Sequence, residues 1–238
     1  MIKLTVAIAV GPGDYNKRHL HKCLDSIRQQ QRPPEYVLIV DDAAHLDFDD
    51  PMFCDLGRRG IRTHKFAWNL GICAAYNTCV SLAPTDWVYL MSSDDELMPH
   101  ALLEAEKAIV GNDEKIGWYW PFLFYDKPKP EHPEGLVVTW PVFVGVVHRE
   151  IWLRSGGLQV VAEKVSPDYA LRKLLQHMMP DVQFIGIGSP ENPTYYSRYS
   201  VESYTGKFGQ WGTQFGMYPI AEKVVELWEH PKWTEGFR

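Results

Sequence analysis

The sequence has no lysine- or arginine-rich run, no cysteine pair with CxxC spacing and no apolar segment long enough to cross a membrane. The first absence, with the net charge of −6, disfavours a nucleic-acid duplex as partner. The absence of CxxC spacing favours reduced thiols in a cytoplasmic protein. Three of the cysteines fall on helix-like faces and are predicted to be buried: Cys23, Cys73 and Cys79. The apolar run Thr5–Val10 is too short for a membrane span and lacks a signal-cleavage pattern, so it is predicted to be a first strand.

Internal repeats and low-complexity segments are absent as well. The chain of 238 residues is long enough to bury a substantial core, and 45% hydrophobic with 23% charged residues is ordinary for a globular protein. These values fit one domain or one domain with a small appendage, and a single domain over residues 1–238 is the prediction.

The stretch Trp87–Pro99 carries the first sign of function. It begins with Trp-Val-Tyr-Leu-Met, which is typical of a strand buried on both faces, and Pro99 opens a predicted helix. Asp94, Asp95 and Glu96 therefore lie where a buried strand leaves the sheet. Acids at such a point commonly hold a divalent cation and, through it, phosphate, although a solvated acidic turn would fit the same residues.

Two further predicted strands also end at polar residues. Leu4–Val10 runs into a Gly-Pro-Gly-Asp turn, and Tyr36–Val40 runs into Asp41 and Asp42. One amphipathic helix separates these strands and another precedes the acidic strand, so the sheet is predicted to be mostly parallel with right-handed crossovers. In such a sheet the three polar strand ends meet at one edge.

The second half of the sequence has a different pattern. The aromatic and β-branched runs Ile116–Tyr125 and Leu136–Val147 predict a mixed-sheet extension. The other predicted elements are a short helix, an amphipathic helix with Ser166-Pro167-Asp168 at its start, a strand and a mobile binding loop rich in Tyr, Ser and Gly: His148–Gly157, Ser166–Met178, Val182–Ile187 and Asn192–Trp211.

Several segments occur in an order that is itself informative. They are Val6–Val10 with its Gly-Pro-Gly-Asp turn, Cys23–Ile27, Tyr36–Asp42, Asn69–Asn77, Trp87–Pro99, Val146–Trp152 with Gly156-Gly157, and Pro167–Arg172. This ordered set resembles the inverting glycosyltransferases of family 2, over roughly residues 4–200. The resemblance implies the α/β fold called GT-A, a Rossmann-like, mostly parallel central sheet flanked by helices with a smaller mixed-sheet extension. It also implies a nucleotide-sugar-binding half at 1–100 and an acceptor-side half at 101–212. The spacing of Ile220, Val224, Leu227 and Trp228 predicts a C-terminal helix, placed at 213–238.

The resemblance assigns roles to four acids. Asp42 matches the residue that contacts the nucleotide base. Asp94 and Asp95 match the DxD region, which holds the ribose and a divalent metal, Mn²⁺ or Mg²⁺, on the donor diphosphate. Asp168 matches the catalytic base, although an acid at the start of a helix is also explained by the helix dipole alone.

The remaining candidates complete the donor and acceptor sides. Gly11, Asp14, Asn69 and Asn77 are predicted to bind the donor. His148 and Arg149 are predicted to bind its phosphates, because Arg forms bidentate contacts, although both could be the exposed start of a helix. Trp211, inside the predicted binding loop, is the candidate for the acceptor. Most other tryptophans, Trp118 among them, are predicted to be core or sheet residues.

Three departures from the family pattern bear on the metal and the base. Ser92 stands where the first acid of the DxD region is usual, so either Asp94 or Asp95 is left to meet the metal. Pro167 replaces the first of two adjacent acids at the base position. A histidine found downstream in relatives is absent near Tyr196-Ser-Arg198.

The predicted function is transfer of a sugar, with inversion, from a nucleotide-diphosphate sugar to an acceptor hydroxyl on a saccharide, lipid, protein or modified base. A UDP-sugar is the favoured donor. One alternative is nucleotidyl transfer to a sugar phosphate, which would need a longer, basic glycine-rich loop than the Gly-Pro-Gly-Asp turn. Another is a non-catalytic module that binds sugar nucleotides, motivated by Ser92 and the absent histidine.

Overall fold

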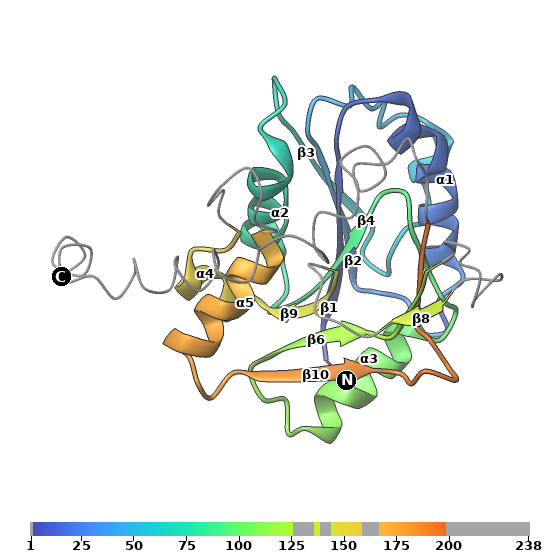
Figure 1. Cartoon of the computed structure of the whole chain (residues 1–238). Coiled ribbons are helices and arrows are strands. Elements are labelled where there is room, and N and C mark those ends of the chain that lie inside the picture. The colour runs from blue at the N-terminus through green and yellow to red at the C-terminus, as the bar shows by residue number, and fades with distance from the viewer. Residues whose placement is uncertain (1, 126–135, 139–143, 159–166, 199–238) are drawn as a thin grey trace, which may run out of the picture.

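A seven-stranded sheet in the order β10-β6-β9-β4-β1-β2-β3 forms the middle of the molecule (Figure 1). The computed structural model describes residues 2–125, 136–138, 144–158 and 167–198. The strands of this sheet are β1 (Leu4–Val10), β2 (Tyr36–Asp41), β3 (Ile61–Lys65), β4 (Trp87–Ser92), β6 (Gly117–Pro121), β9 (Gly145–His148) and β10 (Gln183–Ile187). Trp211, Trp140 and the predicted C-terminal helix lie outside the described residues.

Most of this sheet is parallel, as predicted. β1 pairs in parallel with both β2 and β4, β2 pairs with β3, and β6 pairs with β10. Only β9 among these strands runs the other way, between β4 and β6. The central strands are buried on both faces, which explains why they are continuous apolar runs rather than alternating ones.

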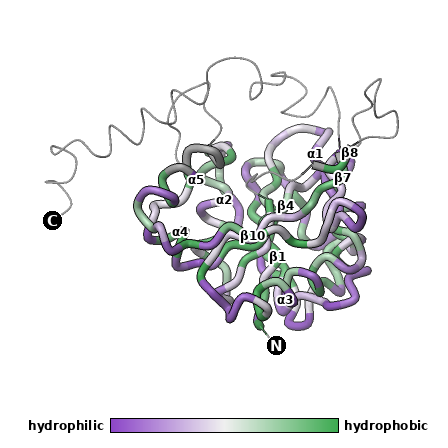
Figure 2. The backbone as a smooth tube through the Cα atoms, turned by 60° about the horizontal axis from the view of Figure 1, so that its bottom comes forward, coloured by the Kyte–Doolittle hydropathy of each residue, from purple (hydrophilic) through white to green (hydrophobic). Residues whose placement is uncertain are grey.

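Helices cover both faces of the sheet. They are α1 (Asp14–Arg28), α2 (Gly71–Leu82), α3 (Ala101–Gly111), α4 (Arg149–Ser155) and α5 (Pro167–Met178), and a short 3₁₀ helix η1 spans Pro51–Phe53. One apolar cluster joins α1 and α3 to one face, and a second joins α2, α4 and α5 to the other. In Figure 2, hydrophobic strands such as β1 and β4 lie within a more hydrophilic periphery. The predicted fold class, a mostly parallel sheet flanked by helices, is therefore confirmed.

A smaller mixed sheet adjoins the acidic end of β4. It has the order β5-β11-β7-β8, with β5 at Glu96–Leu97, β7 at Leu123–Tyr125, β8 at Leu136–Val138 and β11 at Tyr195–Ser197. The prediction of a mobile loop from Asn192 is wrong for β11, because its backbone pairs with β5 on one side and β7 on the other. Pairing with distant strands overrides the loop-like composition of this segment.

Two other expectations can be checked against the described residues. All four cysteines are free thiols, with Cys23, Cys73 and Cys79 buried as predicted. In the part of the chain that the structure describes, every helix is too short or too polar to cross a bilayer.

Candidate active site

The carboxyl ends of β1, β2 and β4 lie side by side at one edge of the sheet. The register pairs Val10 with Asp41, and Ala9 with Ser92, so the three chains leave the sheet at the same level. Gly11 and Asp42 directly follow β1 and β2, and Asp94 is the second residue after β4. The predicted convergence of polar strand ends at one edge is thus confirmed, and we call this region the carboxyl edge.

Asp41 and Asp42 both bind backbone groups at the carboxyl edge. The Asp41 carboxylate accepts hydrogen bonds from the N–H groups of the loop after β2, at Ala44, His45 and Leu46, over 2.6–3.1 Å. The Asp42 carboxylate accepts from Leu70 N at 2.6 Å and Gly71 N at 2.9 Å, the first free donors of α2. Asp42, which follows β2, thereby caps the N-terminus of α2, where the helix dipole stabilises a negative charge. A carboxylate has about four acceptor positions, so two remain on Asp42 for a ligand.

Asp95 is a buried acid in the turn after β4. Its Oδ2 accepts a hydrogen bond from the Tyr195 hydroxyl at 2.9 Å, and its Oδ1 accepts one from Arg198 N at 2.7 Å. The Tyr195 hydroxyl itself accepts from Ser92 N at 3.1 Å. Burial and the neighbouring Asp94 raise the pKa of Asp95 well above its usual range, although these hydrogen bonds oppose the rise. Asp95 therefore ties the turn after β4 to β11, and each of its oxygens accepts one hydrogen bond from that segment.

Asp94 is less enclosed and lies beside a cation and a phenol. Burial raises its pKa, while its own backbone N–H, the Arg198 charge and a hydrogen bond with Tyr15 act in the opposite direction. The Arg198 guanidinium donates from Nε to the Asp94 carbonyl at 3.1 Å and from Nη2 to Glu96. Arg198 thus binds the Asp94 carbonyl, the Asp95 carboxylate through its own backbone N–H, and the Glu96 carboxylate. Of the three carboxylates, that of Asp94 is the one that Arg198 does not bind directly.

The sequence analysis missed four residues at this edge. Tyr15 and His19 lie one turn apart on α1, with their rings 4.9 Å apart, and Tyr195 and Arg198 come from β11 and the residue after it. Among the described residues the buried Nδ1 of His19 has no hydrogen-bond partner, and burial and Arg198 lower the pKa of this side chain. The spacing of Tyr15 and His19 was the one signal available, and it gave no hint of which sheet edge they would face.

Removing the charge of Asp95 is expected to stabilise the ligand-free chain near neutral pH. A raised pKa in the folded state stabilises the fold fully below the unfolded pKa of about 3.9, and that contribution is lost as the pH rises through the folded pKa. Asp95→Asn keeps the shape and cannot ionise. Its melting temperature should exceed that of the wild type by a few degrees near neutral pH, and the gap should close toward pH ~4.

Thermal unfolding followed across this pH range measures the gap. Asp86→Asn, an exposed acid at the other end of β4, is the matched control and should show no such gap. A variant that is less stable than the wild type at every pH would show that the ionised carboxylate is needed for folding, against this account.

Three other donor-binding candidates also lie at the carboxyl edge. Gly11 directly follows β1, and its carbonyl accepts a hydrogen bond from Asn16 Nδ2 at 3.2 Å. Asp14 is exposed at the first position of α1, and Asn69 is exposed just before the α2 residues that Asp42 caps. Their positions fit a ligand that lies along this edge.

Asn77 lies away from this edge, in the middle of α2. Its side chain contacts Trp152 of α4 and the backbone of Leu158. The two asparagines predicted to bind the donor therefore have different surroundings, one exposed and one enclosed.

His148 and Arg149 lie at the opposite edge of the sheet. His148 pairs with Trp87, the first residue of β4, so about 20 Å of strand separates it from Asp94. Arg149 donates from its backbone N to Asp86 O and from Nη2 to Ser81 O. The prediction that these residues join Asp94 at the donor phosphates does not fit this geometry, because β9 runs antiparallel and brings its end to the amino edge.

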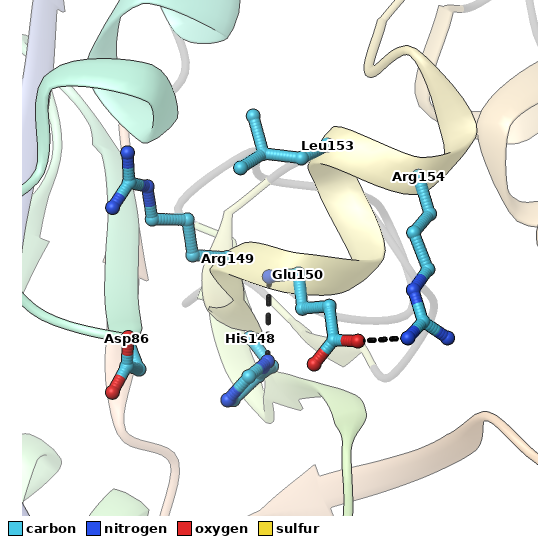
Figure 3. A pocket seen from close by; sticks show the side chains of 6 residues that line it. All are labelled: Asp86, His148, Arg149, Glu150, Leu153 and Arg154. Atoms are coloured by element: carbon cyan, nitrogen blue, oxygen red, sulfur yellow. Dashed lines mark hydrogen bonds and ion pairs between the residues drawn. The ribbon is translucent and has the colours of Figure 1, made fainter.

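These residues line a separate, shallow pocket of about 370 Å³ (Figure 3). His148 Nδ1 accepts from Glu150 N at 3.3 Å, and Glu150 pairs with Arg154. Arg149 extends toward α2. The structure agrees with the alternative interpretation of these two residues as the start of a helix, since α4 begins at Arg149.

Asp168 is the second residue of α5. This helix joins β10 through a short link, and Figure 1 shows it running from the start of β10 back toward α2. Its residues Leu171 and Leu175 are buried in the cluster that contains α2 and α4. The first turn of α5 is therefore at the end of the helix away from β10, on the side of the sheet that α2 covers.

The carboxyl edge offers a divalent cation a small number of carboxylate ligands. Among the described residues there is no group of three His, Cys, Asp or Glu side chains placed to hold a metal ion. Mg²⁺, however, is usually held by one or two carboxylates together with substrate phosphates and water. Asp94 meets that smaller requirement, while each oxygen of Asp95 already accepts one hydrogen bond, from Tyr195 or from Arg198.

Comparison with known proteins agrees with this geometry. The model of the family described as "Glycosyl transferase family 2" matches residues 15–158, more than half of the chain. This chain belongs to glycosyl transferase family 2. The match contains Asp42, Asn77 and Asp94, and it ends before Asp168 and Arg198, so it says nothing about those two. No curated protein sequence matches the chain.

Solved structures show the same GT-A fold. S. aureus TarS 1–349 in complex with UDP-GlcNAc superposes with a TM-score of 0.64 at 14% identity, over 96% of this chain and 67% of that one. The same fragment in complex with UDP gives 0.59 at 13% identity, over 99% and 74%. A longer TarS structure gives 0.63 at 12% identity, and this chain spans only 45% of it. At such identities the likeness concerns the fold.

Proposed function

We propose that this chain transfers a sugar from a nucleotide-diphosphate sugar to an acceptor hydroxyl, with inversion at the anomeric carbon. The observation that carries the proposal is the pair Asp42 and Asp94 at one edge of a family 2 fold. They follow strands on either side of β1, so about 10 Å, two strand spacings, separates them. A nucleotide lying across the end of β1 reaches both.

Asp42 would take the nucleoside end of the donor. The cap on α2 fixes its carboxylate, so a base N–H meets an acceptor that is already oriented. UDP-sugar is the favoured donor because the TarS fragment is known in complex with UDP-GlcNAc and with UDP, and uracil carries one such N–H.

Asp94 would take the diphosphate end. A carboxylate and a diphosphate repel each other, and Mn²⁺ or Mg²⁺ between them offsets this repulsion and the charge that grows on the leaving group. Asp94 would be the main protein ligand of that ion, and Asp95 would hold the turn in place through Tyr195 and Arg198. The Arg198 guanidinium adds a fixed positive charge at the same edge.

Asp168 would act as the base toward the acceptor. The acceptor oxygen forms a bond to the anomeric carbon from the face opposite the diphosphate, and the bond from that carbon to the diphosphate oxygen breaks. The proton of the acceptor hydroxyl goes to the Asp168 carboxylate, and the electron pair leaves with the nucleoside diphosphate. A base in this role typically contributes about 100- to 10,000-fold.

Asp42→Ala is expected to weaken the binding of UDP by about 1–3 kcal/mol, because a base N–H then lacks its charged partner. The loss should be absent for inorganic pyrophosphate, which has no base. Calorimetric titration of both ligands in Mn²⁺ measures this difference. A thermal-shift panel of nucleotide sugars is run before the titration. In that panel, only compounds that bind the folded chain raise its melting temperature.

Asp41→Ala is the matched control, since that neighbouring carboxylate caps only a loop. It should lower stability and leave the ratio of UDP to pyrophosphate affinity unchanged. An equal loss for UDP and pyrophosphate in Asp42→Ala would remove Asp42 from the nucleoside site. A panel in which no nucleotide sugar stabilises the chain would contradict the proposed function.

A further inference from the structure

The amide of Asn77 joins two halves of the molecule. Its Oδ1 accepts hydrogen bonds from Trp152 Nε1 and Leu158 N, each at 2.8 Å, and its Nδ2 donates to Leu158 O at 2.8 Å. Asn77 lies on α2, whereas Trp152 lies on α4 and Leu158 just after it. One side chain thus satisfies both backbone groups of a residue 81 positions away in the sequence.

The chain after α4 is shaped to fit this amide. Gly156 and Gly157 have φ values of 76° and 70°, a left-handed conformation that favours glycine. A Cβ on Gly157 would lie 2.3 Å from Asn77 Oδ1 and 2.4 Å from Trp152 Nε1, which is closer than atoms approach. The Gly156-Gly157 turn therefore wraps closely around the Asn77–Trp152 contact, and we call the contacts of Asn77 with Trp152 and Leu158 the α2–α4 lock.

The helix that carries Asp168 packs on the same place. Leu171 and Leu175 of α5 are buried in one apolar cluster with Trp152 and Leu158. Since protein interiors are close-packed, a shift of Trp152 or Leu158 moves α5 as well, because the cluster has no empty space to accommodate it. The position of the first turn of α5 thus depends on the α2–α4 lock.

The start of α2 is fixed at the carboxyl edge. Asp42 caps Leu70 and Gly71, and Asn77 lies six residues further along the helix, about 9 Å by helical rise. One helix therefore connects the carboxylate proposed for the nucleoside to the packing that supports Asp168. These two fixed points on α2, at its start and at its middle, set the distance between the donor and the base.

We infer that Asn77 is a positioning residue for the catalytic base, acting through Trp152, Leu158 and α5. The inference rests on the proposed function, in which Asp168 is that base. It replaces the prediction that Asn77 binds the donor, because its amide is engaged by Trp152 and Leu158. Asn77 contributes to the rate by keeping the base at the distance that proton transfer requires.

Asn77→Ala is expected to lower the turnover of UDP-GlcNAc by roughly 10- to 100-fold, since a misplacement of about 1 Å can cost that much. The affinity for UDP in Mn²⁺ should stay within about two-fold, because the carboxyl edge is untouched. Turnover is followed as UDP release with water as the accepting hydroxyl, and affinity by calorimetry. Asn112→Ala is the matched control, as its Nδ2 donates to Ala108 O at 2.8 Å on a helix of the other face.

A double-mutant cycle with Asp168→Asn separates positioning from general loss of structure. If Asn77 acts through Asp168, its replacement should cost at most a few-fold more once the base is gone. Fully additive losses would overturn the inference, as would a UDP affinity that falls in parallel with turnover. If Asp168→Asn alone keeps its turnover, the proposed base has failed, and that result is visible before Asn77 is changed.

Trp152→Phe keeps the test open should Asn77→Ala not fold. The phenyl ring retains most of the packing and removes only the Nε1–H that Asn77 accepts. It should show the same fall in turnover, smaller in size, with unchanged UDP affinity and the same non-additivity with Asp168→Asn. Wild-type turnover in a folded Trp152→Phe that has lost stability would make the lock purely structural and would overturn the inference.

Discussion

Replacing Asp168 by asparagine is expected to lower turnover of UDP-GlcNAc by roughly 100-fold or more while the affinity for UDP is retained. The base acts only while the accepting hydroxyl loses its proton, so it contributes to the transition state and hardly to donor binding. Asparagine keeps the size of the side chain and its place at the start of α5, and it removes the basicity. UDP release and calorimetry on the same preparation measure both quantities.

The helix-dipole explanation of Asp168 predicts the opposite pairing, a small loss of stability with turnover largely kept. Asp181→Asn is a suitable control, because this exposed acid follows the other end of α5. It should leave turnover unchanged. Turnover of Asp168→Asn within a few-fold of the wild type would refute the assignment of the base, and Glu163 would then be the next acid to test.

Replacing Asp94 by alanine is expected to remove the metal dependence of UDP binding. In the wild type, UDP should bind far more tightly with Mn²⁺ than without it, because the carboxylate and the diphosphate otherwise repel each other. In Asp94→Ala the affinity with Mn²⁺ should fall by about 10- to 100-fold, the equivalent of a lost charged partner. Without metal, the variant should bind UDP at least as well as the wild type, since the repulsion is gone.

The strand that carries Asp94 offers its own control. Asp86 precedes β4 as Asp94 follows it, so Asp86→Ala removes the same charge from the amino edge. That variant should keep both the affinity and its dependence on Mn²⁺. Equal affinity with and without metal in the wild type would contradict the role given to Asp94, whatever the variants show.

The sequence was sufficient to predict the carboxyl edge because that edge depends on patterns local to each strand. Tyr36–Asp41 and Trp87–Ser92 are apolar runs with acids at their ends or within two residues of them, and buried parallel strands have such apolar runs. Once the intervening helices make the strands parallel, their ends must meet. Asp42 and Asp94 therefore lie close together for reasons that are visible in the sequence.

Other features depend on contacts between distant segments, and composition does not encode these. Gly145–His148 has the residues of any buried strand, and nothing in them shows that it runs antiparallel and takes His148 to the amino edge. Tyr195 reads as a loop residue until β5 and β7 pair with its strand. Asn77 looked like a ligand-binding residue because its partners, Trp152 and Leu158, are far away in the chain.

The location of the donor is the central claim, and amide hydrogen exchange with and without UDP-GlcNAc and Mn²⁺ tests it most directly. Binding at the carboxyl edge should slow exchange at the amides that hold Asp42 and Asp95, namely those of Leu70, Gly71 and Arg198, and in residues 92–96. Exchange in residues 148–154, around the pocket at the amino edge, should not change. Protection confined to residues 148–154 would contradict the account, since the donor would then lie at the end of the sheet away from Asp94.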